Sequence, residues 1–422
     1  MATFAIDLTP LKKYPDFRNL WTAGLISYFG SMITYVALPF QLKELTGSYL
    51  AVGLLGVVEI VPLIIFGLYG GVLADSVDRK KMVWATEAGA LILVLVLLGN
   101  SLLGSPTTLA IYLVAALFAV VDGLQRPSMD AMLPRLVSHE DLPAASALLS
   151  LRWQLGVIVG PTIGGIIFST MSVSAGYVVD IATYVLSLLF LARVRSIPPS
   201  KEAEKPSLAA LLDGVKYAFR RQDLLGTYII DLAAMTLAMP MALYPFWADE
   251  LNAPWALGFF YAAITVGSVI VTLTSGWTRT YRFHGRAVIL AAMGWGLAIA
   301  AAGLSNSLIL VLLFLTIAGA SDMVSALFRG NIWNQTIPDT LRGRLAGIEL
   351  LSYSVGPLAG QLRAASMAAA TTLSISVTSG GLMCVVVVAL LAIFLPKMWK
   401  YDVQTNEFAV REREIRKNRE IS

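Results

Sequence analysis

The sequence predicts an all-α membrane protein whose twelve transmembrane helices form two pseudo-symmetric six-helix bundles. Three observations predict this fold: the composition, the number of long apolar runs and a repeat that relates the two halves. Of the 422 residues, 57% are hydrophobic and only 14% are charged, a balance outside the range of soluble globular proteins. Apolar runs of about 20 residues are long enough to cross a hydrocarbon core of about 30 Å as helices.

Twelve such runs follow one another along the chain. They cover residues 19–42, 50–73, 82–103, 107–132, 143–170, 173–194, 224–248, 255–279, 287–304, 307–333, 343–369 and 372–395. The first run is too long for a signal peptide and no small-residue cleavage site follows it, so we expect it to remain as the first transmembrane helix. The chain has a single cysteine, Cys384, which excludes an intrachain disulfide.

Basic residues predict the orientation in the membrane. Most of the 31 Lys and Arg residues lie before the first run, after even-numbered runs or after the last one, including Arg79, Lys80 and Lys81. Because cytoplasmic loops carry the excess of positive charge, both termini are predicted to be cytoplasmic. The net charge of +4 is then a consequence of topology, and it indicates a lipid bilayer as partner and not a nucleic acid.

The polar stretch RSIPPSKEAEKPS divides the chain into two halves. The predicted organisation is a six-helix bundle over 1–194, a linker over 195–223, a second six-helix bundle over 224–396 and a charged cytoplasmic tail over 397–422. Within the linker, Leu208, Leu211 and Leu212 lie opposite Asp213 at helical spacing. This pattern predicts an amphipathic helix lying on the membrane surface.

The two halves repeat each other at corresponding places. VGPTIGG at 159–165 is matched by VGPLAG at 355–360, Asp122 is matched by Asp322, and a similar proline-containing turn follows each of these acidic residues. Parallel six-helix repeats are typical of secondary transporters, which bind substrate near the bilayer midplane between the repeats. The repeat therefore predicts a transporter.

The stretch GVIVGPTIGG, residues 156–165, combines small residues with a proline. Gly156, Gly160 and Gly164 recur at four-residue spacing, which lets two helix backbones approach closely in lipid. Pro161 adds a bend that neighbouring helices can accommodate, and Gly165 extends the small surface. We interpret the stretch as a seam that moves during transport, with the eighth helix as the expected partner; the alternative is a packing seam that does not move.

The stretch GGVLADSVDRKK, residues 70–81, follows the second apolar run. Gly71 permits tight helix packing, Asp75 can lie against the positive N-terminus of a helix, and Arg79 can pair with a carboxylate such as Asp130. Such a cluster would hold one conformation closed from the cytoplasmic side. The alternative is that the basic residues of this stretch only reflect the excess of positive charge in cytoplasmic loops. That alternative leaves Gly71 and Asp75 unexplained.

Charged residues inside the apolar runs form the candidate site, because a charge at the bilayer centre costs on the order of 3 kcal/mol and must face a cavity or a partner. Asp122, Arg126 and Asp130 share one face of their helix, as do Asp322 and Arg329. The remaining charges are Arg152, Asp231, Glu59, Glu87, Asp180 and Glu349. These groups either form structural ion pairs or carry protons. Asp231 is the first choice for the proton because its own helix offers no cation, and Asp322 and Asp122 come next.

The motifs resemble a known family. G-x-x-x-D-x-x-x-R-K-K at 71–81 and G-x-x-x-G-P-x-x-G-G at 156–165 are similar to the loop and antiporter signatures of the major facilitator superfamily, and YPDFRNLW and IPDTLRGRLAG resemble its siderophore-exporting and macrolide-efflux branch. The resemblance implies a bacterial inner-membrane transporter whose helices 1, 4, 7 and 10 line the central cavity. It thereby places Asp122, Arg126, Asp231, Asp322 and Arg329 in that cavity. SGWTRTYRFHGR, after the eighth run, departs from the loop signature because it lacks the acidic residue.

The expected function is proton-coupled export of a siderophore, or of a similar bulky aromatic or anionic compound, by alternating access. Tyr28 and Tyr35, together with Arg126, Arg152 and Arg329, suit such a small-molecule substrate. Macrolide-type or multidrug efflux is the alternative within the same class, and lipid flipping is a third transport hypothesis. An alternative of another class is a non-transporting receptor or scaffold that binds partners through the tail.

The sequence offers no basis for enzymatic catalysis. The dipeptide Gly-Lys never occurs, which excludes a P-loop, and His139 and His284 lie in separate turns without a metal-ligand pattern. We therefore expect no cofactor and no metal. Protons are the expected energy source and a monomer is the expected state.

Overall fold

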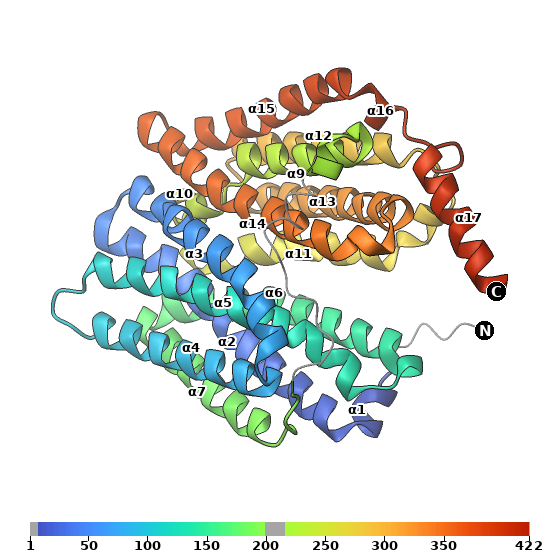
Figure 1. The fold of residues 1–422 in the computed structure, drawn as a ribbon. Coiled ribbons are helices and arrows are strands. Elements are labelled where there is room, and N and C mark those ends of the chain that lie inside the picture. Colours follow the sequence, from blue (N-terminus) through green and yellow to red (C-terminus); the bar gives the residue numbers. More distant parts are fainter. Residues whose placement is uncertain (1–6, 199–215, 422) are drawn as a thin grey trace. The chain divides into compact units, whose positions relative to one another are not determined.

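The computed structural model describes residues 7–198 and 216–421, except for some side chains within α3, α14 and α17. Every regular element in these residues is helical (Figure 1). The long helices are α2 (Pro15–Thr46), α3 (Tyr49–Ser76), α4 (Arg79–Ser101), α5 (Thr108–Leu136), α6 (Leu142–Thr170), α7 (Val173–Ala192), α9 (Gln222–Ala238), α11 (Leu257–Leu273), α12 (His284–Gly303), α13 (Leu308–Thr336), α14 (Asp339–Ala370) and α15 (Leu373–Phe394). The short ones are α1 (Thr9–Lys13), α10 (Tyr244–Glu250), α16 (Pro396–Trp399) and α17 (Glu407–Ile421).

These helices confirm the predicted fold class. Eleven helical segments of the described residues are long and apolar enough to cross a membrane, and α14 occupies the one remaining predicted span, 343–369. The chain is therefore a multi-pass membrane protein. The predicted amphipathic helix of the linker lies mostly in residues 199–215, outside the described part of the chain.

Local capping sets several helix boundaries. The side chains of Ser48, Asp78, Ser172 and Thr372 each accept a hydrogen bond from the backbone N–H three residues further on, which satisfies an amide at a helix start that has no partner within the helix. At the end of α2, Gly47 adopts a left-handed conformation with φ of 61°, as is common after a helix C-terminus. Short polar turns thus separate the apolar helices.

The seventh predicted span is one membrane crossing but not one continuous helix. The prediction of unbroken helix over 224–248 was wrong because α9 ends at Ala238 and a 3₁₀ turn, Met241–Leu243, precedes α10. Pro240 has no backbone N–H and disfavours helical geometry in the residue before it. Met239 is accordingly extended, with φ of −104° and ψ of 100°.

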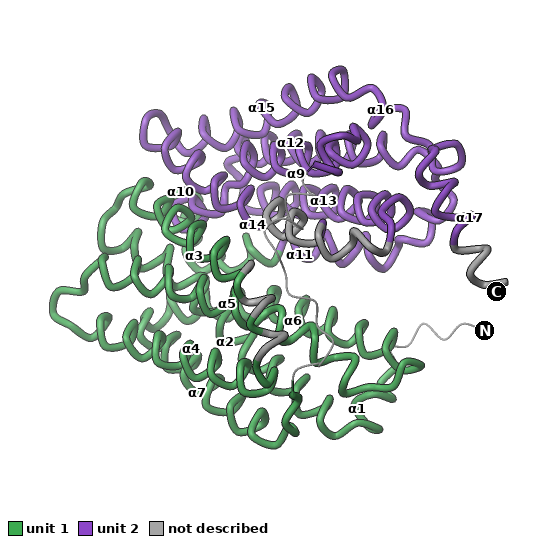
Figure 2. The backbone as a smooth tube through the Cα atoms, viewed as in Figure 1, with its two compact units in different colours: residues 1–206, 248–262 green, residues 207–247, 263–422 purple. Residues whose placement is uncertain are grey.

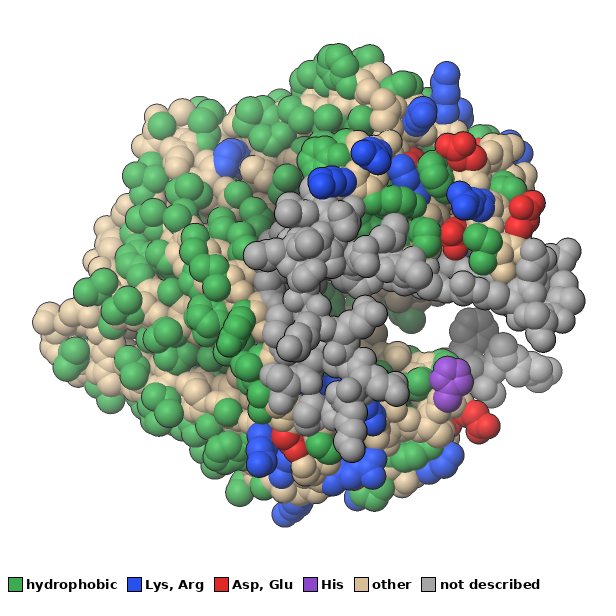
Figure 3. Space-filling view, in the orientation of Figure 1, with side chains coloured by type: hydrophobic (Ala, Val, Ile, Leu, Met, Phe, Trp, Pro, Cys, Tyr) green, Lys and Arg blue, Asp and Glu red, His purple; other side chains and the backbone are tan. Residues whose placement is uncertain are grey.

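The chain forms two compact units (Figure 2). Unit 1 comprises residues 1–206 and 248–262, and unit 2 comprises 207–247 and 263–422. The change of unit falls within α10, a few residues after the break in the seventh span, since the end of α10 and the start of α11 group with the first six long helices. In the view of Figure 3, hydrophobic side chains cover most of the described surface and charged side chains gather towards one end of the helices, as expected for spans in lipid.

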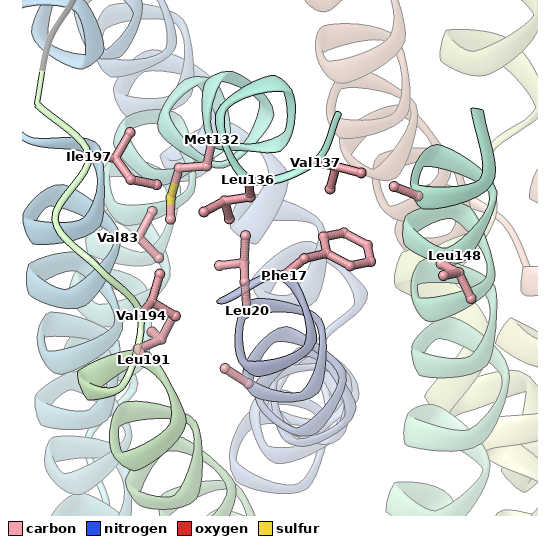
Figure 4. Close-up of a cluster of buried hydrophobic side chains, with 12 residues drawn as sticks. Phe17, Leu20, Val83, Met132, Leu136, Val137, Leu148, Leu191, Val194 and Ile197 are labelled. Carbon is pink, nitrogen blue, oxygen red and sulfur yellow. The ribbon is translucent and has the colours of Figure 1, made fainter. Parts of the chain in front are cut away.

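A hydrophobic cluster closes unit 1 at the end where α2 begins and α5 stops (Figure 4). Phe17 and Leu20 of α2 pack with Met132 and Leu136 of α5, and Leu148 of α6 completes the cluster. All five side chains are at most 4% exposed. Burying such a side chain contributes about 1.5–3 kcal/mol where water is the alternative environment, so this end of the unit is firmly packed.

The C-terminal segment packs on unit 2. Arg221 and Asp223 form a buried ion pair with 2.7 Å between Nη2 and Oδ2, and Arg221 also donates to the carbonyl oxygen of Thr336 at 2.9 Å. The ring of Phe408 in α17 covers the Arg221 guanidinium, with 3.7 Å between the ring centroid and Arg221 Cζ. The side-chain amide of Asn406 donates a hydrogen bond to Asp223 at 3.3 Å. The start of the predicted tail is thus anchored to the beginning of α9 and the end of α13.

This anchor gives a stability prediction. Replacing Phe408 with leucine keeps the apolar contact but removes the cation–π interaction, so unit 2 should lose about 1–2 kcal/mol. Thermal unfolding of the purified protein in detergent measures the loss as a lower melting temperature. Phe219→Leu is the matched control, since Phe219 is 68% exposed; equal melting temperatures for the two variants would contradict the anchor.

Candidate transport site

In unit 2, the predicted site residues form a three-membered charge cluster. Asp231 of α9 and Arg329 of α13 form an ion pair, and Arg329 Nη2 also lies 3.9 Å from Asp322 Oδ1. Asp231 and Arg329 are 6% and 7% exposed, whereas the side chain of Asp322 is 34% exposed. Two helices thus bring together three residues that the sequence singled out.

The cluster has a chemical consequence. A buried charge is tolerated when it is paired, and the planar guanidinium of Arg329 offers several donors that can serve two carboxylates. A proton on Asp231 would weaken that pair and leave Asp322 as the other anionic partner of Arg329. The sequence argument for Asp231 considered cations only on its own helix; its partner comes from α13.

In unit 1, three predicted residues share the exposed side of α5. Asp122, Arg126 and Asp130 are all exposed, and Arg126 interacts electrostatically with both carboxylates. Glu59 of α3 also interacts with Asp122. The spacing of four residues therefore places alternating charges in one row, as predicted.

Arg152 of α6 lies against the backbone of α2. A Cβ atom on Gly24 would lie 2.8 Å from Arg152 Cζ, so a larger residue at this position would displace the guanidinium. Arg152 interacts electrostatically with Glu87, Tyr28 and Asp130. Arg152 thus interacts with polar residues of three other helices of unit 1, α2, α4 and α5.

The two predicted tyrosines differ in environment. The ring of Tyr28 packs on Gly156, where an added Cβ would lie 3.0 Å from Tyr28 Cε1. Tyr35 is 40% exposed and meets Tyr261 edge-to-face with 5.9 Å between ring centroids. Tyr35 is therefore the more accessible of the two for a substrate.

The glycine stripe of α6 packs on α2. Added Cβ atoms on Gly160 and Gly164 would lie 2.8 Å from the Phe29 carbonyl oxygen and 3.4 Å from Ile33 Cα. The expected partner of this stripe was the eighth helix, α11. It is the adjacent residues Pro161 and Gly165 of α6 that approach that helix. A Cβ on Gly165 would lie 2.6 Å from the amide nitrogen of Gly258, and Gly258 in turn packs on Pro161. The small residues thus serve two close approaches within unit 1.

The loop motif is described only in part. Arg79 begins α4, is 6% exposed and donates its backbone N–H to the Ile197 carbonyl at 3.0 Å, while the surroundings of Gly71 and the side chain of Asp75 lie outside the described part of the structure. Asp78 caps α4. Although burial raises the pKa of Asp78, hydrogen bonds from the Ser196 hydroxyl and the Lys81 backbone amide outweigh it and hold that pKa below its usual value. The carboxylate therefore stays ionised at neutral pH.

Two buried acids in unit 1 received no specific role from the sequence. Glu87 of α4 is 6% exposed and Asp180 of α7 is fully buried. Thr34 and Thr183 donate hydrogen bonds to Asp180, and Glu87 accepts from three helices. Polar residues recurring within apolar runs are the only sequence signal for this cluster, and they do not indicate which side chains meet.

The chain is similar to known transporters over nearly its whole length. The profile of a family described as transmembrane secretion effector, within the major facilitator superfamily, matches residues 5–419. The enterobactin exporter EntS of Shigella boydii serotype 18 is 29% identical over 401 residues, covering 94% of this chain and 96% of that protein. EntS of Escherichia coli O81 matches to the same extent.

Solved structures show the same fold. The nucleoside transporter NupG aligns with a TM-score of 0.72 at 13% identity, over 92% of this chain and 100% of that one. A mutant of a peptide transporter, POT, in complex with alafosfalin gives 0.71 at 12% identity over 92% and 95%. The human organic anion transporter MFSD10 gives 0.63 at 14% identity over 89% and 99%.

Proposed function

Because this chain belongs to the transmembrane secretion effector family of the major facilitator superfamily, we propose that it is a proton-coupled exporter of a siderophore or a similar bulky aromatic or anionic compound. Members of this superfamily are transporters and not enzymes. The observation that carries the siderophore assignment is the full-length similarity to enterobactin exporters. We place the protein in a bacterial inner membrane as a monomer, with both termini in the cytoplasm.

The charge cluster of unit 2 supports proton coupling. Asp231 is buried and shares Arg329 with Asp322, so a proton arriving on one carboxylate changes the partner of a buried cation. The membrane potential supplies about 2.3 kcal/mol per charge per 100 mV. At about 1.4 kcal/mol per tenfold, one proton supports a substrate gradient of about fortyfold.

The remaining predicted residues have roles in alternating access. Asp122, Arg126 and Arg152 are proposed to bind the substrate together with Tyr28 and Tyr35. The glycines of α6, with Pro161, form the seam along which the helix moves. Gly71, Asp75, Arg79 and Asp130 form the cytoplasmic latch that holds one conformation.

The substrate class can be tested in cells that synthesise enterobactin and whose exporters have been deleted. Expression of this protein is expected to release enterobactin into the medium during iron limitation and to lower its intracellular level. Macrolide sensitivity of the same cells is measured in parallel. Restored macrolide resistance without enterobactin release would replace the siderophore assignment by drug efflux.

Asp231→Asn tests coupling through the unit 2 cluster. Asparagine keeps the shape of aspartate but cannot take up a proton, so gradient-driven accumulation of enterobactin in proteoliposomes should fall about tenfold, while exchange at equal pH continues. Asp249→Asn is the control: its partially exposed pair with Lys43 contributes little. Full accumulation by Asp231→Asn would remove Asp231 from the proton path.

A further inference from the structure

Four helices of unit 1 converge on one carboxylate. Glu87 of α4 accepts hydrogen bonds from Ser27 of α2 at 3.2 Å, from Gln125 of α5 at 2.8 Å and from Ser187 of α7 at 3.1 Å. These donors are neutral. No ion pair to Glu87 occurs among the residues that the structure describes.

A cation with an unused donor interacts electrostatically with this carboxylate. Arg152 of α6 interacts electrostatically with Glu87, but its Nη1 is buried and, within the described structure, finds no hydrogen-bond acceptor. A buried donor without an acceptor costs about 1–3 kcal/mol, more when it is charged. An ionised Glu87 carboxylate would supply the hydrogen-bond acceptor that Arg152 Nη1 lacks.

The surroundings of Glu87 suit both of its protonation states. An ionised carboxylate accepts from all three donors, whereas a neutral carboxylic acid needs one acceptor, which the hydroxyl oxygen of Ser27 or Ser187 can provide by rotation. At membrane depth, an ionised carboxylate without a cation is disfavoured. The arrangement in which Arg152 stands apart from Glu87 is therefore the one that suits the protonated acid.

We propose that Glu87 is a proton-binding site of unit 1 and that Arg152 competes with the proton for it. When the proton leaves, the carboxylate and the guanidinium pair; when a proton returns to the carboxylate, the pair separates. Arg152 lies over Gly24 on α2, and its helix carries the glycine stripe that packs on α2. Movement of Arg152 towards Glu87 therefore acts directly on the α2–α6 seam.

Other titratable groups face this pair from the neighbouring helices. Asp180 and Tyr184 of α7 interact electrostatically with Glu87, while Tyr28 of α2 and Asp130 of α5 interact with Arg152. Asp180 is held by Thr34 and Thr183, and no ion pair joins it to a cation among the described residues. None of these groups offers Glu87 a positive charge, which leaves Arg152 as the competitor for its proton.

Infrared difference spectroscopy tests the site without any substrate. Purified protein in lipid nanodiscs is titrated with acid and base, and the carbonyl band of a protonated, water-excluded carboxyl group is followed. Glu87→Gln should lack one such band, Glu87→Asp should retain it at a shifted frequency, and Arg152→Gln should hold the proton about tenfold more tightly because its competitor is gone. An unchanged band in Glu87→Gln, or an unchanged titration in Arg152→Gln, would overturn the proposal.

The role in transport rests on the proposed function and is measured separately, with enterobactin as the probe. In proteoliposomes, gradient-driven accumulation of enterobactin by Glu87→Gln should be about tenfold lower than by wild type. Exchange of enterobactin at equal pH should remain within about twofold of wild type. Glu44→Gln, whose side chain is 52% exposed, is the matched control. Wild-type accumulation by Glu87→Gln removes the site from the coupling mechanism. If wild type itself does not transport enterobactin, the substrate assignment fails, and the infrared titration decides on Glu87 alone.

Discussion

Replacing Arg329 with methionine is expected to abolish gradient-driven transport and to lower the stability of unit 2 by about 3–5 kcal/mol, the usual cost of removing one partner from a buried ion pair. The substitution leaves Asp231 and Asp322 without the cation they share. Methionine is unbranched and fills much of the volume of the arginine stem, so the effect reports mainly on the lost charge. Thermal unfolding in detergent and accumulation in proteoliposomes measure the two losses.

A double variant separates the two effects. Combining Arg329→Met with Asp231→Asn removes the uncompensated charge, so the stability should recover in large part while gradient-driven accumulation remains lost. Arg413→Met controls for the loss of a positive charge, since Arg413 is exposed near the C-terminus. Transport at the wild-type rate by Arg329→Met would show that the cluster is dispensable.

Gly160→Ala is expected to have the second-largest effect. The added Cβ would lie 2.5 Å from Met32 Cβ and 2.8 Å from the Phe29 carbonyl oxygen, so α6 and α2 would have to separate. Overpacking of this kind costs about 1–3 kcal/mol. If α6 moves along this seam during transport, the rate should fall about tenfold, and initial rates of enterobactin exchange measure this.

Two glycines serve as matched controls. At Gly164, on the same stripe, the nearest atom would lie 3.4 Å away, and at Gly99 in α4 nothing lies within 4 Å. Gly164→Ala should therefore be mild, and Gly99→Ala should stabilise its helix by about 0.5–1 kcal/mol. A Gly160→Ala variant that is as active and as stable as these two would refute the close approach.

The sequence predicted the helices well and their contacts only in part. Long apolar runs determine where spans lie because lipid requires every backbone polar group to be bonded within the segment. The break before Pro240 also has a local signal, which hydropathy alone overlooks. By contrast, the pair of Asp231 and Arg329 joins two helices far apart in the sequence, and no spacing rule indicates it.

The polar cluster around Glu87 shows the same limit. Its members lie on α2, α4, α5 and α7, and each looks like an isolated polar residue in an apolar run. Arg152 was predicted as a site residue on its charge alone, and its contact with Gly24 depends on how α6 crosses α2. Residues that share one helix, such as Asp122, Arg126 and Asp130, could be grouped from periodicity; residues that meet across helices could not.

The measurement that tests the central claim most directly is uptake of iron-free enterobactin into inverted membrane vesicles with an acidic lumen. In these vesicles, uptake corresponds to export, and protons leaving the lumen drive it. Collapse of the pH gradient by an ionophore is predicted to reduce uptake about tenfold, to the level of vesicles that lack the protein. Uptake that depends on the protein but continues unchanged after the collapse would contradict proton-coupled export.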